Sequence, residues 1–254
     1  MHCVEDKFRR AISRMVSPGD RVLVAVSGGV DSVVMLHLFN KLRLEISNFS
    51  LAVAHLNHLA RGEDSNRDED FVSNLCQKLG LKIFIDRIDV TEISLNRVTS
   101  FQETARNVRH AFLNRILSEW GGDLVSLGHN ADDQVESFLI NILRGSGLLG
   151  LTKTPSKKGR YIRPLYGCFR SEIEDYIGLN GLKHCSDLTN LKTHYLRNKI
   201  RLDLIPFLKS FNPKIKSSLI ETSGLLTDDE DYLQKEVDKI FSKVVINDQE
   251  SNFP

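Results

Sequence analysis

Short apolar runs rich in β-branched residues alternate along this chain with segments of helical periodicity, and this alternation constrains the fold more than any other feature. The apolar runs are 21–26 (RVLVAV), 49–55, 82–88 and 123–127. The segments whose apolar residues recur every three or four positions are 32–44, 64–79, 101–119 and 131–143. Repeated strand–helix units predict a doubly wound, mainly parallel sheet covered on both faces. Ligands of such an α/β fold bind at the carboxyl ends of the strands.

The character of the chain changes after Gly150. A basic loop leads to an extended segment at 161–165, helical stretches at 170–179 and 194–208, and a helical extension from about residue 212. The acidic run Thr227–Glu230 predicts the start of a last helix, because acidic side chains favour the positive end of a helix. We therefore expect a domain over residues 1–210 and a helical extension or linker over 211–254.

Composition excludes several classes of protein. Apolar residues make up 41% and charged residues 26% of the 254, ordinary values that argue against disorder. No apolar run approaches the roughly 18 residues that cross a bilayer, and the charged N-terminus has no signal-peptide core. The four cysteines form no C-x-x-C pair, so neither a zinc knuckle nor a dithiol redox site is indicated. These features predict a cytoplasmic protein with reduced thiols and no membrane partner.

The net charge of +1 conceals an uneven distribution. Residues 151–220 carry 14 basic and 5 acidic side chains, a net of +9. Such a concentration suggests a surface for a polyanion such as RNA, with a merely solvated basic face as the alternative.

The sequence Ser27-Gly28-Gly29-Val30-Asp31-Ser32 lies between the first strand and its helix, where a phosphate-binding loop belongs. Two glycines let the backbone approach an anion, the helix N-terminus points amides at it, and the serines add hydroxyl donors. Asp31 could hold Mg²⁺ against the phosphates or orient the loop. The G-x-x-x-x-G-K-[ST] pattern of P-loop nucleotidases is absent. A G-x-G-x-x-G match at 145–150 follows a helix, so it does not indicate a dinucleotide site.

Further polar groups gather where later strands end. His55 ends the second strand in the sequence HLNH and could meet adenine, ribose or phosphate. Arg106 shares a polar helix face with Glu103 and Arg109, which could form a solvated ion-pair array or supply charge to phosphates.

The fourth strand leads into Gly128-His129-Asn130-Ala131-Asp132-Asp133-Gln134-Val135-Glu136. We expect Asp132, Asp133 and Glu136 to line one rim of the helix, suited to an ammonium group or to Mg²⁺. The apolar residues predicted to pack inward beneath them are Val135, Phe138, Leu139 and Ile142.

The loop at 27–32 resembles the signature of the N-type ATP pyrophosphatases, which have a Rossmann-like fold of the adenine nucleotide alpha-hydrolase type. The further motifs, taken in order, resemble the tRNA(Ile)-lysidine synthetase family over about residues 10–210. The motifs that carry this resemblance are SGGVDS, HLNH, ETARNVR, GHNADDQVE, RGSG, RPL at 163–165, DLTN at 187–190 and RNKIR at 197–201.

The resemblance implies a reaction in two steps. The family uses ATP to adenylate C2 of the wobble cytidine in the CAU anticodon of an isoleucine tRNA, releasing pyrophosphate. Free L-lysine then attacks C2 through its ε-amine, and AMP leaves. For residues 1–210 this implies a catalytic domain with ATP and Mg²⁺ as cofactors and tRNA(Ile) as partner.

Site residues can be assigned on the same basis. The loop Ser27–Ser32 and His55 would bind ATP, with Asp31 as the metal ligand. Arg106 and His129 would meet the developing charge, and Asp132, Asp133 and Glu136 would bind metal or lysine. The tRNA-binding residues implied are Arg163, Arg197 and Arg201.

Other readings stay open at this point. The chain could use another acceptor, as tRNA thiolases and small-metabolite amidating synthetases do, or it could be a nucleotide-sensing or RNA-binding module without catalysis. Many family members are dimers, so a homodimer is possible. Many also continue into further C-terminal domains, so this chain is either a short form or a truncated one.

Overall fold

The computed structural model describes residues 3–46, 49–59, 62–95, 101–152, 154–185 and 196–248. The chain forms two compact units. Unit 1 consists of Met1–Ala131 and Pro155–Leu188, and unit 2 of Asp132–Thr154 and Thr189–Pro254. These units are defined by contacts and do not test the expected domains at 1–210 and 211–254, which stay a prediction.

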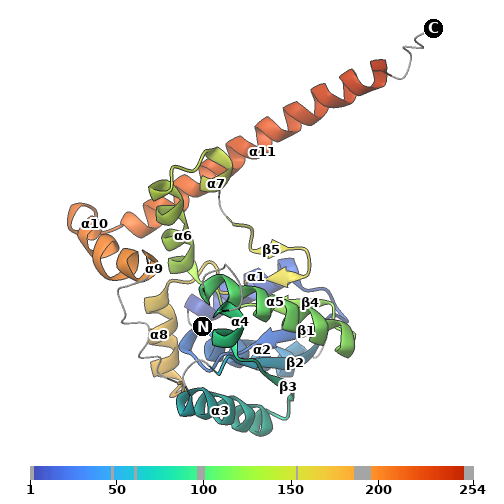
Figure 1. Ribbon diagram of the computed structural model, residues 1–254, viewed down its shortest axis with the longest axis vertical. Helices are drawn as coiled ribbons and strands as arrows, with labels where there is room; N and C mark the ends of the chain where they lie inside the picture. The colour runs from blue at the N-terminus through green and yellow to red at the C-terminus, as the bar shows by residue number, and fades with distance from the viewer. Residues whose placement is uncertain are drawn as a thin grey trace. The chain divides into compact units, whose positions relative to one another are not determined.

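Unit 1 is built on a six-stranded sheet in the order β3-β2-β1-β4-β6-β5 (Figure 1). Its strands are β1 Arg21–Ala25, β2 Ser50–Asn57, β3 Lys82–Arg87, β4 Leu124–Ser126, β5 Lys157–Lys158 and β6 Tyr161–Ile162. All neighbouring strands are parallel except the edge pair β5 and β6. The predicted doubly wound, mainly parallel sheet is therefore confirmed.

The helices of unit 1 are α1 Cys3–Met15, α2 Val30–Ile46, α3 Glu63–Leu79, α4 Val90–Leu95, α5 Phe101–Trp120 and α8 Arg170–Leu179. The helices predicted in this unit at 32–44, 64–79, 101–119 and 170–179 lie within about two residues of their expected bounds. Gly80 ends α3 in the left-handed conformation, with φ 61°, because glycine lacks the Cβ that disfavours it.

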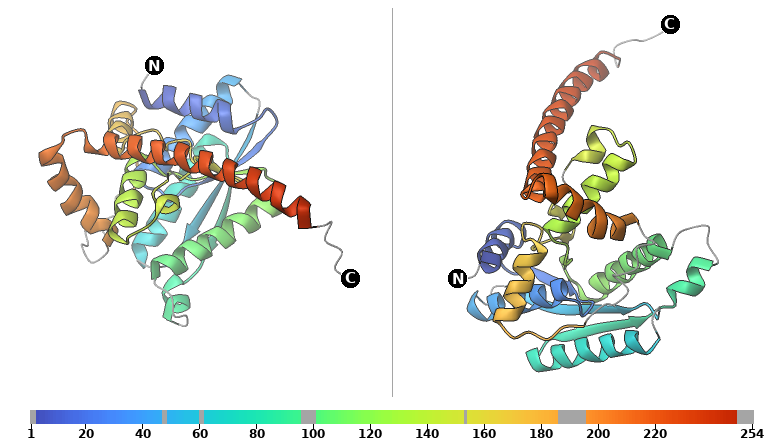
Figure 2. Two further views of the ribbon diagram at one scale, coloured as in Figure 1. Left: turned by 90° about the horizontal axis from the view of Figure 1, so that it is seen from above. Right: turned by 90° about the vertical axis from the view of Figure 1, so that its left-hand side faces the viewer.

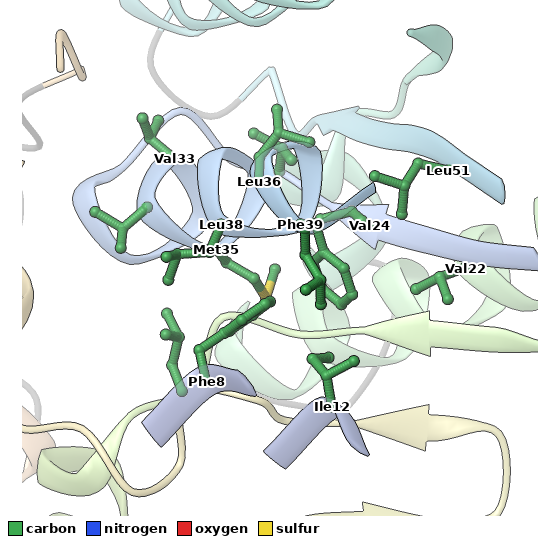
Figure 3. Close-up of a cluster of buried hydrophobic side chains, with 14 of the residues drawn as sticks. Phe8, Ile12, Val22, Val24, Val33, Met35, Leu36, Leu38, Phe39 and Leu51 are labelled. Atoms are coloured by element: carbon green, nitrogen blue, oxygen red, sulfur yellow. The ribbon is translucent and has the colours of Figure 1, made fainter. Parts of the chain in front are cut away.

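Two apolar layers enclose the sheet. Alternate residues of β1 divide between them: Val22 and Val24 enter the layer beneath α1, α2 and α8, whereas Leu23 enters the layer beneath α5. In the first layer the rings of Phe8 and Phe39 meet edge to face at 5.0 Å. Figure 3 shows this cluster between α1 and α2.

Unit 2 is helical. It contains the turns of α6 (Ala131–Leu143) from Asp132 onward, followed by α7 Leu148–Leu151, α9 Leu196–Lys199, the π-helical segment η2 Ile200–Leu204, α10 Ile205–Phe211 and α11 Ile215–Asp248. Its small core joins Val135 and Leu139 of α6 to Ile200 and Ile205. None of the helices in the described ranges is long and apolar enough to span a bilayer.

Three sequence predictions about these helices were wrong. The last helix does not begin at Thr227, because α11 runs unbroken from Ile215 (Figure 2). In its first turns the partly buried Leu219 and Ile220 pack against the small core of unit 2. Ile142, expected inside, is 47% exposed. Glu136, expected on a polar rim, is fully buried.

Candidate nucleotide and ion-pair sites

The loop Ser27–Ser32 joins β1 to the N-terminus of α2, as the sequence predicts. Gly28 has φ +92°, a conformation that only glycine adopts without strain. The Ser32 hydroxyl accepts the Ser27 N–H at 3.2 Å and donates to the Gly29 carbonyl at 2.8 Å. Val30 begins α2, so the loop presents its backbone at the positive end of a 17-residue helix.

Cys185 lies against this loop, although no motif in the sequence indicates that contact. Its N–H donates to the Gly28 carbonyl at 2.9 Å. A Cβ added at Gly28 would lie 3.2 Å from the Cys185 sulfur. The conformation of the loop therefore favours glycine at position 28, and a Cβ there would be in tight contact with the Cys185 sulfur.

Asp31 supplies the carboxylate of the loop, and both of its oxygens are engaged. The side-chain amide of Asn130 donates to Oδ1 at 3.0 Å, and Nη1 of Arg170 contacts Oδ2 at 2.6 Å. Asn130 follows β4 and Arg170 begins α8, so the topology of the sheet brings both residues to the loop. Sequence inspection missed Arg170 because its partner lies 139 positions away.

The residues of this loop fit a magnesium ion that arrives with phosphates. Mg²⁺ is usually held by one or two carboxylates together with substrate phosphates and waters, and Asp31 offers one such carboxylate. Within the described part of the chain, no group of three or more His, Cys, Asp or Glu side chains forms a metal site of its own.

The turn after β4 packs closely on the same loop. A Cβ at Gly128 would lie 3.4 Å from the backbone nitrogen of Ser32. The Ala131 N–H donates to the Cys168 carbonyl at 2.8 Å. His129 is half-buried within this turn, so it lies in the same part of unit 1 as the loop.

His55 lies within β2 and is 3% exposed. Its Nδ1 is 2.8 Å from the carbonyl oxygen of Val26, so Nδ1 carries the proton and donates. Asn57, in the same HLNH sequence, is buried and donates to Glu69 Oε2 at 2.9 Å. The guanidinium of Arg87 bonds the same Glu69 carboxylate, and this lowers the pKa of Glu69. Asn57 therefore has a structural role that the motif did not indicate.

Arg106 and Arg163, assigned separately from the sequence, lie near enough in unit 1 for their charges to interact. Burial lowers the pKa of Arg163, and the positive charge of Arg106 lowers it further. Nη1 of Arg163 donates to the Pro155 carbonyl at 2.9 Å. Burial also lowers the pKa of His110, with further contributions from Arg109, Arg106 and Arg163. These side chains form a positive cluster, suited to an anion.

Three acids of α6 and three cations from the C-terminal part of the chain form a second cluster within unit 2. The Glu136 carboxylate accepts hydrogen bonds from Nε of Arg197 and from Nε of Arg201, each at 2.6 Å. Nη2 of Arg197 also reaches Asp133 at 2.7 Å. Lys216 of α11 forms an ion pair with Asp132.

The acid-rich and arginine-rich motifs of unit 2 therefore balance each other in charge. Burial alone would lower the pKa of Arg201, but its hydrogen bond to Glu136 and the charge of that carboxylate raise it overall. About 40% of each arginine side chain stays exposed, 39% for Arg197 and 42% for Arg201. The DLTN sequence at 187–190, which contributed to the family resemblance, lies outside the described residues.

Comparisons with known proteins agree with this fold and loop. A family model described as a PP-loop domain matches residues 2–208. A tRNA(Ile)-lysidine synthase of Clostridium perfringens (strain 13 / Type A) is 40% identical over 239 residues, which cover 93% of this chain and 51% of the relative. One of Bacteroides thetaiotaomicron is 38% identical over 228 residues, 90% of this chain and 52% of the relative. The chain thus spans about half the length of the curated relatives it matches.

A solved structure shares the fold. The U34-tRNA thiolase NcsA from Methanococcus maripaludis, solved with its [4Fe-4S] cluster, superposes with a TM-score of 0.73 at 22% identity. The match covers 89% of this chain and 78% of the thiolase. At that identity the likeness supports the architecture of the chain alone.

Proposed function

Because the chain belongs to the PP-loop domain family, we propose that it binds ATP on the loop Ser27–Ser32 and carries out the lysidine-forming reaction on an isoleucine tRNA. The observation that carries this proposal is the identity of about 40% with tRNA(Ile)-lysidine synthases over nine-tenths of the chain. The proposed substrates are ATP, free L-lysine and a tRNA(Ile) with a CAU anticodon. The expected cytoplasmic location and the homodimer are proposed with them.

In the proposed first step, the O2 oxygen of the wobble cytidine attacks the α-phosphorus of ATP and pyrophosphate leaves. The loop amides and the N-terminus of α2 would hold the phosphates. Mg²⁺ would neutralise phosphate charge there, with Asp31 as its protein ligand. Arg106 and His129 would stabilise the charge that develops on the departing pyrophosphate, and His55 would border the nucleotide.

In the proposed second step, the ε-amine of lysine attacks C2, the C2–O bond breaks and AMP leaves. Only the free amine is nucleophilic, so a carboxylate must take up its proton. We assign lysine binding and proton transfer to Asp132 and Asp133. Glu136 was expected to share this role, but its carboxylate is fully buried and receives Arg197 and Arg201, so we assign it to positioning these arginines. Lys216 pairs with Asp132, so its ammonium must leave that carboxylate before the lysine substrate can bind there.

The alternative function, a tRNA thiolase, is less well supported because two of the cysteines are poorly suited to sulfur transfer. Cys76 and Cys168 are buried, which raises the pKa of Cys76 to about 11 and that of Cys168 to about 12. A thiol with so high a pKa is a poor nucleophile at neutral pH. Of the other two cysteines, Cys3 is exposed and Cys185 is half-buried. The lysine ligase is therefore the function we favour.

The test measures pyrophosphate release and incorporation of labelled lysine with ATP, Mg²⁺ and an unmodified CAU-anticodon isoleucine tRNA. A methionine tRNA, which also carries CAU, is the control for specificity. We expect lysine in the isoleucine tRNA alone.

Asp133→Asn should abolish incorporation, and Asp86→Asn should not. Asp86 is a suitable match because it also pairs with an arginine, Arg115, but lies on β3. ATP binding without pyrophosphate release, unaffected by Asp133→Asn, would instead indicate a nucleotide-sensing module.

A further inference from the structure

The ion pair between Asp31 and Arg170 places a permanent cation where a divalent metal would bind. Asp31 is the sole acid of the sequence Ser27–Ser32. Its Oδ2 contacts Nη1 of Arg170 at 2.6 Å, and its side chain is 23% exposed. A guanidinium stays charged at every physiological pH. A metal ion that approaches Asp31 therefore meets a carboxylate that is already neutralised.

Arg170 has a second acidic partner close by. Its Nε donates to Oε1 of Glu174 at 2.7 Å, one turn further along α8. The Arg170 side chain is 39% exposed, so water can also solvate it. Its guanidinium can leave Asp31 and remain paired with Glu174. Release of the loop carboxylate then leaves no buried charge uncompensated.

The backbone that carries Arg170 is fixed independently of this side chain. The Phe169 N–H at the start of α8 donates to Oε2 of Glu172 at 2.7 Å. Lys7 of α1 holds the same carboxylate at 2.7 Å. The other oxygen of Asp31 stays with Asn130, a neutral donor. The guanidinium can exchange partners while α8 and the loop keep their places.

We propose that Arg170 is an internal counter-cation that competes with Mg²⁺ for Asp31, and so sets the Mg²⁺ concentration at which the chain takes up ATP. This inference rests on the proposed ATP-binding function. Mg²⁺ and a guanidinium repel each other at hydrogen-bond range, so they exclude one another from the same carboxylate oxygen. Arg170 is thus a positioning residue, which acts through Asp31.

The experiment measures binding of α,β-methylene ATP by titration calorimetry across a series of Mg²⁺ concentrations. This analogue resists cleavage between the α and β phosphates, so the readout is independent of turnover. We expect Arg170→Gln to lower the half-saturating Mg²⁺ concentration by about fivefold, the factor that a partly exposed ion pair is worth. Arg170→Lys should stay near wild type. Glu174→Gln should raise the requirement, because Arg170 then loses its alternative partner.

Arg115→Gln is the matched control. Arg115 also pairs with an aspartate, Asp86, and with a glutamate one turn on, Glu119, but it lies on α5. Its loss should leave the Mg²⁺ dependence unchanged.

The inference is overturned if Arg170→Gln leaves the Mg²⁺ requirement unchanged, or if this variant loses affinity for the analogue at saturating Mg²⁺. In either case the wild-type chain still binds ATP, so the proposed function stands. A wild-type chain that binds no analogue at any Mg²⁺ concentration overturns both proposals. Thermal melting of each variant shows whether it is folded. If Arg170→Gln unfolds, the rise expected in Glu174→Gln decides the question.

Discussion

Gly28 shows how a single residue serves both the conformation and the spacing of the phosphate loop. Its φ of +92° costs an L-residue about 1–2 kcal/mol, and a Cβ there would also press on Cys185. We expect Gly28→Ala to lower the free energy of unfolding by more than this and to weaken nucleotide binding.

Gly19 provides the control for that variant. It has the same φ of +92°, but nothing lies within 4 Å of an added Cβ. Gly19→Ala should therefore show the cost of backbone strain alone, with nucleotide binding unchanged. Urea unfolding and calorimetry of both variants separate the two effects. Equal losses of stability in the two variants would show that the Cys185 side chain moves aside without a measurable loss of unfolding free energy.

His110 makes the stability of the fold depend on pH. Burial and the charges of three arginines lower its pKa from the ordinary 6.5. The folded chain then binds the proton less tightly than the unfolded chain, so the contribution is present above pH 6.5 and is lost as pH falls through the folded pKa. His110→Gln should flatten the fall in melting temperature between pH 7 and 5.

His37 also has a pKa lowered by burial, so some acid sensitivity should remain in that variant. A matched His37→Gln variant measures the second contribution. If His110→Gln melts with the same pH profile as the wild type, the positive cluster around position 110 does not repel the proton.

At the scale of elements, Glu136 ties α6 to α9 and η2. Its fully buried carboxylate receives two guanidinium groups. Removing one partner of a buried pair leaves the others uncompensated. We expect Glu136→Gln to cost about 3 kcal/mol of unfolding free energy, the lower end of the range for buried pairs because both arginines are partly exposed.

The exposed pair of Glu119 with Arg115 calibrates that result. Both side chains are about half exposed, at 52% and 47%. Glu119→Gln should change stability by less than about 1 kcal/mol in the same urea titration. A loss as small for Glu136→Gln would mean that water replaces the carboxylate inside unit 2.

Strands and helices were predictable where their signal is local. The strand at 21–26 and the helix at 64–79 depend on periodicity and on a stop residue such as Gly80, all within one segment. The start of the last helix was not predictable, because the acids at 228–230 are also compatible with a helix interior. The earlier start depends on contacts of the partly buried Leu219 with residues distant in the sequence.

The candidate site divides in the same way. The glycines and Asp31 were found because the chemistry of a phosphate loop is written in consecutive residues. Arg170 and Lys216 were missed, since their acidic partners are distant in the sequence and no neighbouring residue indicates them. Glu136 was recognised but misplaced, because a buried carboxylate and an exposed one look alike until their cations are known.

For the whole molecule, the basic block at 151–220 is less available to a polyanion than its net charge of +9 suggests. Arg170, Arg197, Arg201 and Lys216 all pair with acids of the chain itself. We expect tRNA affinity to fall with salt, and Arg163→Gln to reduce the slope of log K against log salt by about 1. Filter binding between 50 and 200 mM salt, roughly the range over which this effect is large, measures it.

Arg115→Gln should leave that slope unchanged, since Arg115 lies outside the basic block. A parallel loss of slope in both variants would indicate binding to diffuse charge rather than to a site.

The interleaving of the two units determines the order in which they can fold while the ribosome releases the chain. The chain leaves unit 1 at Asp132, returns at Pro155 and leaves again at Thr189. Because β4 pairs with β6, the sheet cannot be completed until β6 has been synthesised, which happens after the first segment of unit 2. Val135 and Leu139 meanwhile have no core until Ile200, Ile205 and Leu219 emerge. At about 5–20 residues per second, α6 spends several seconds as a nascent helix with an unburied apolar face, the stage at which a chaperone would bind it.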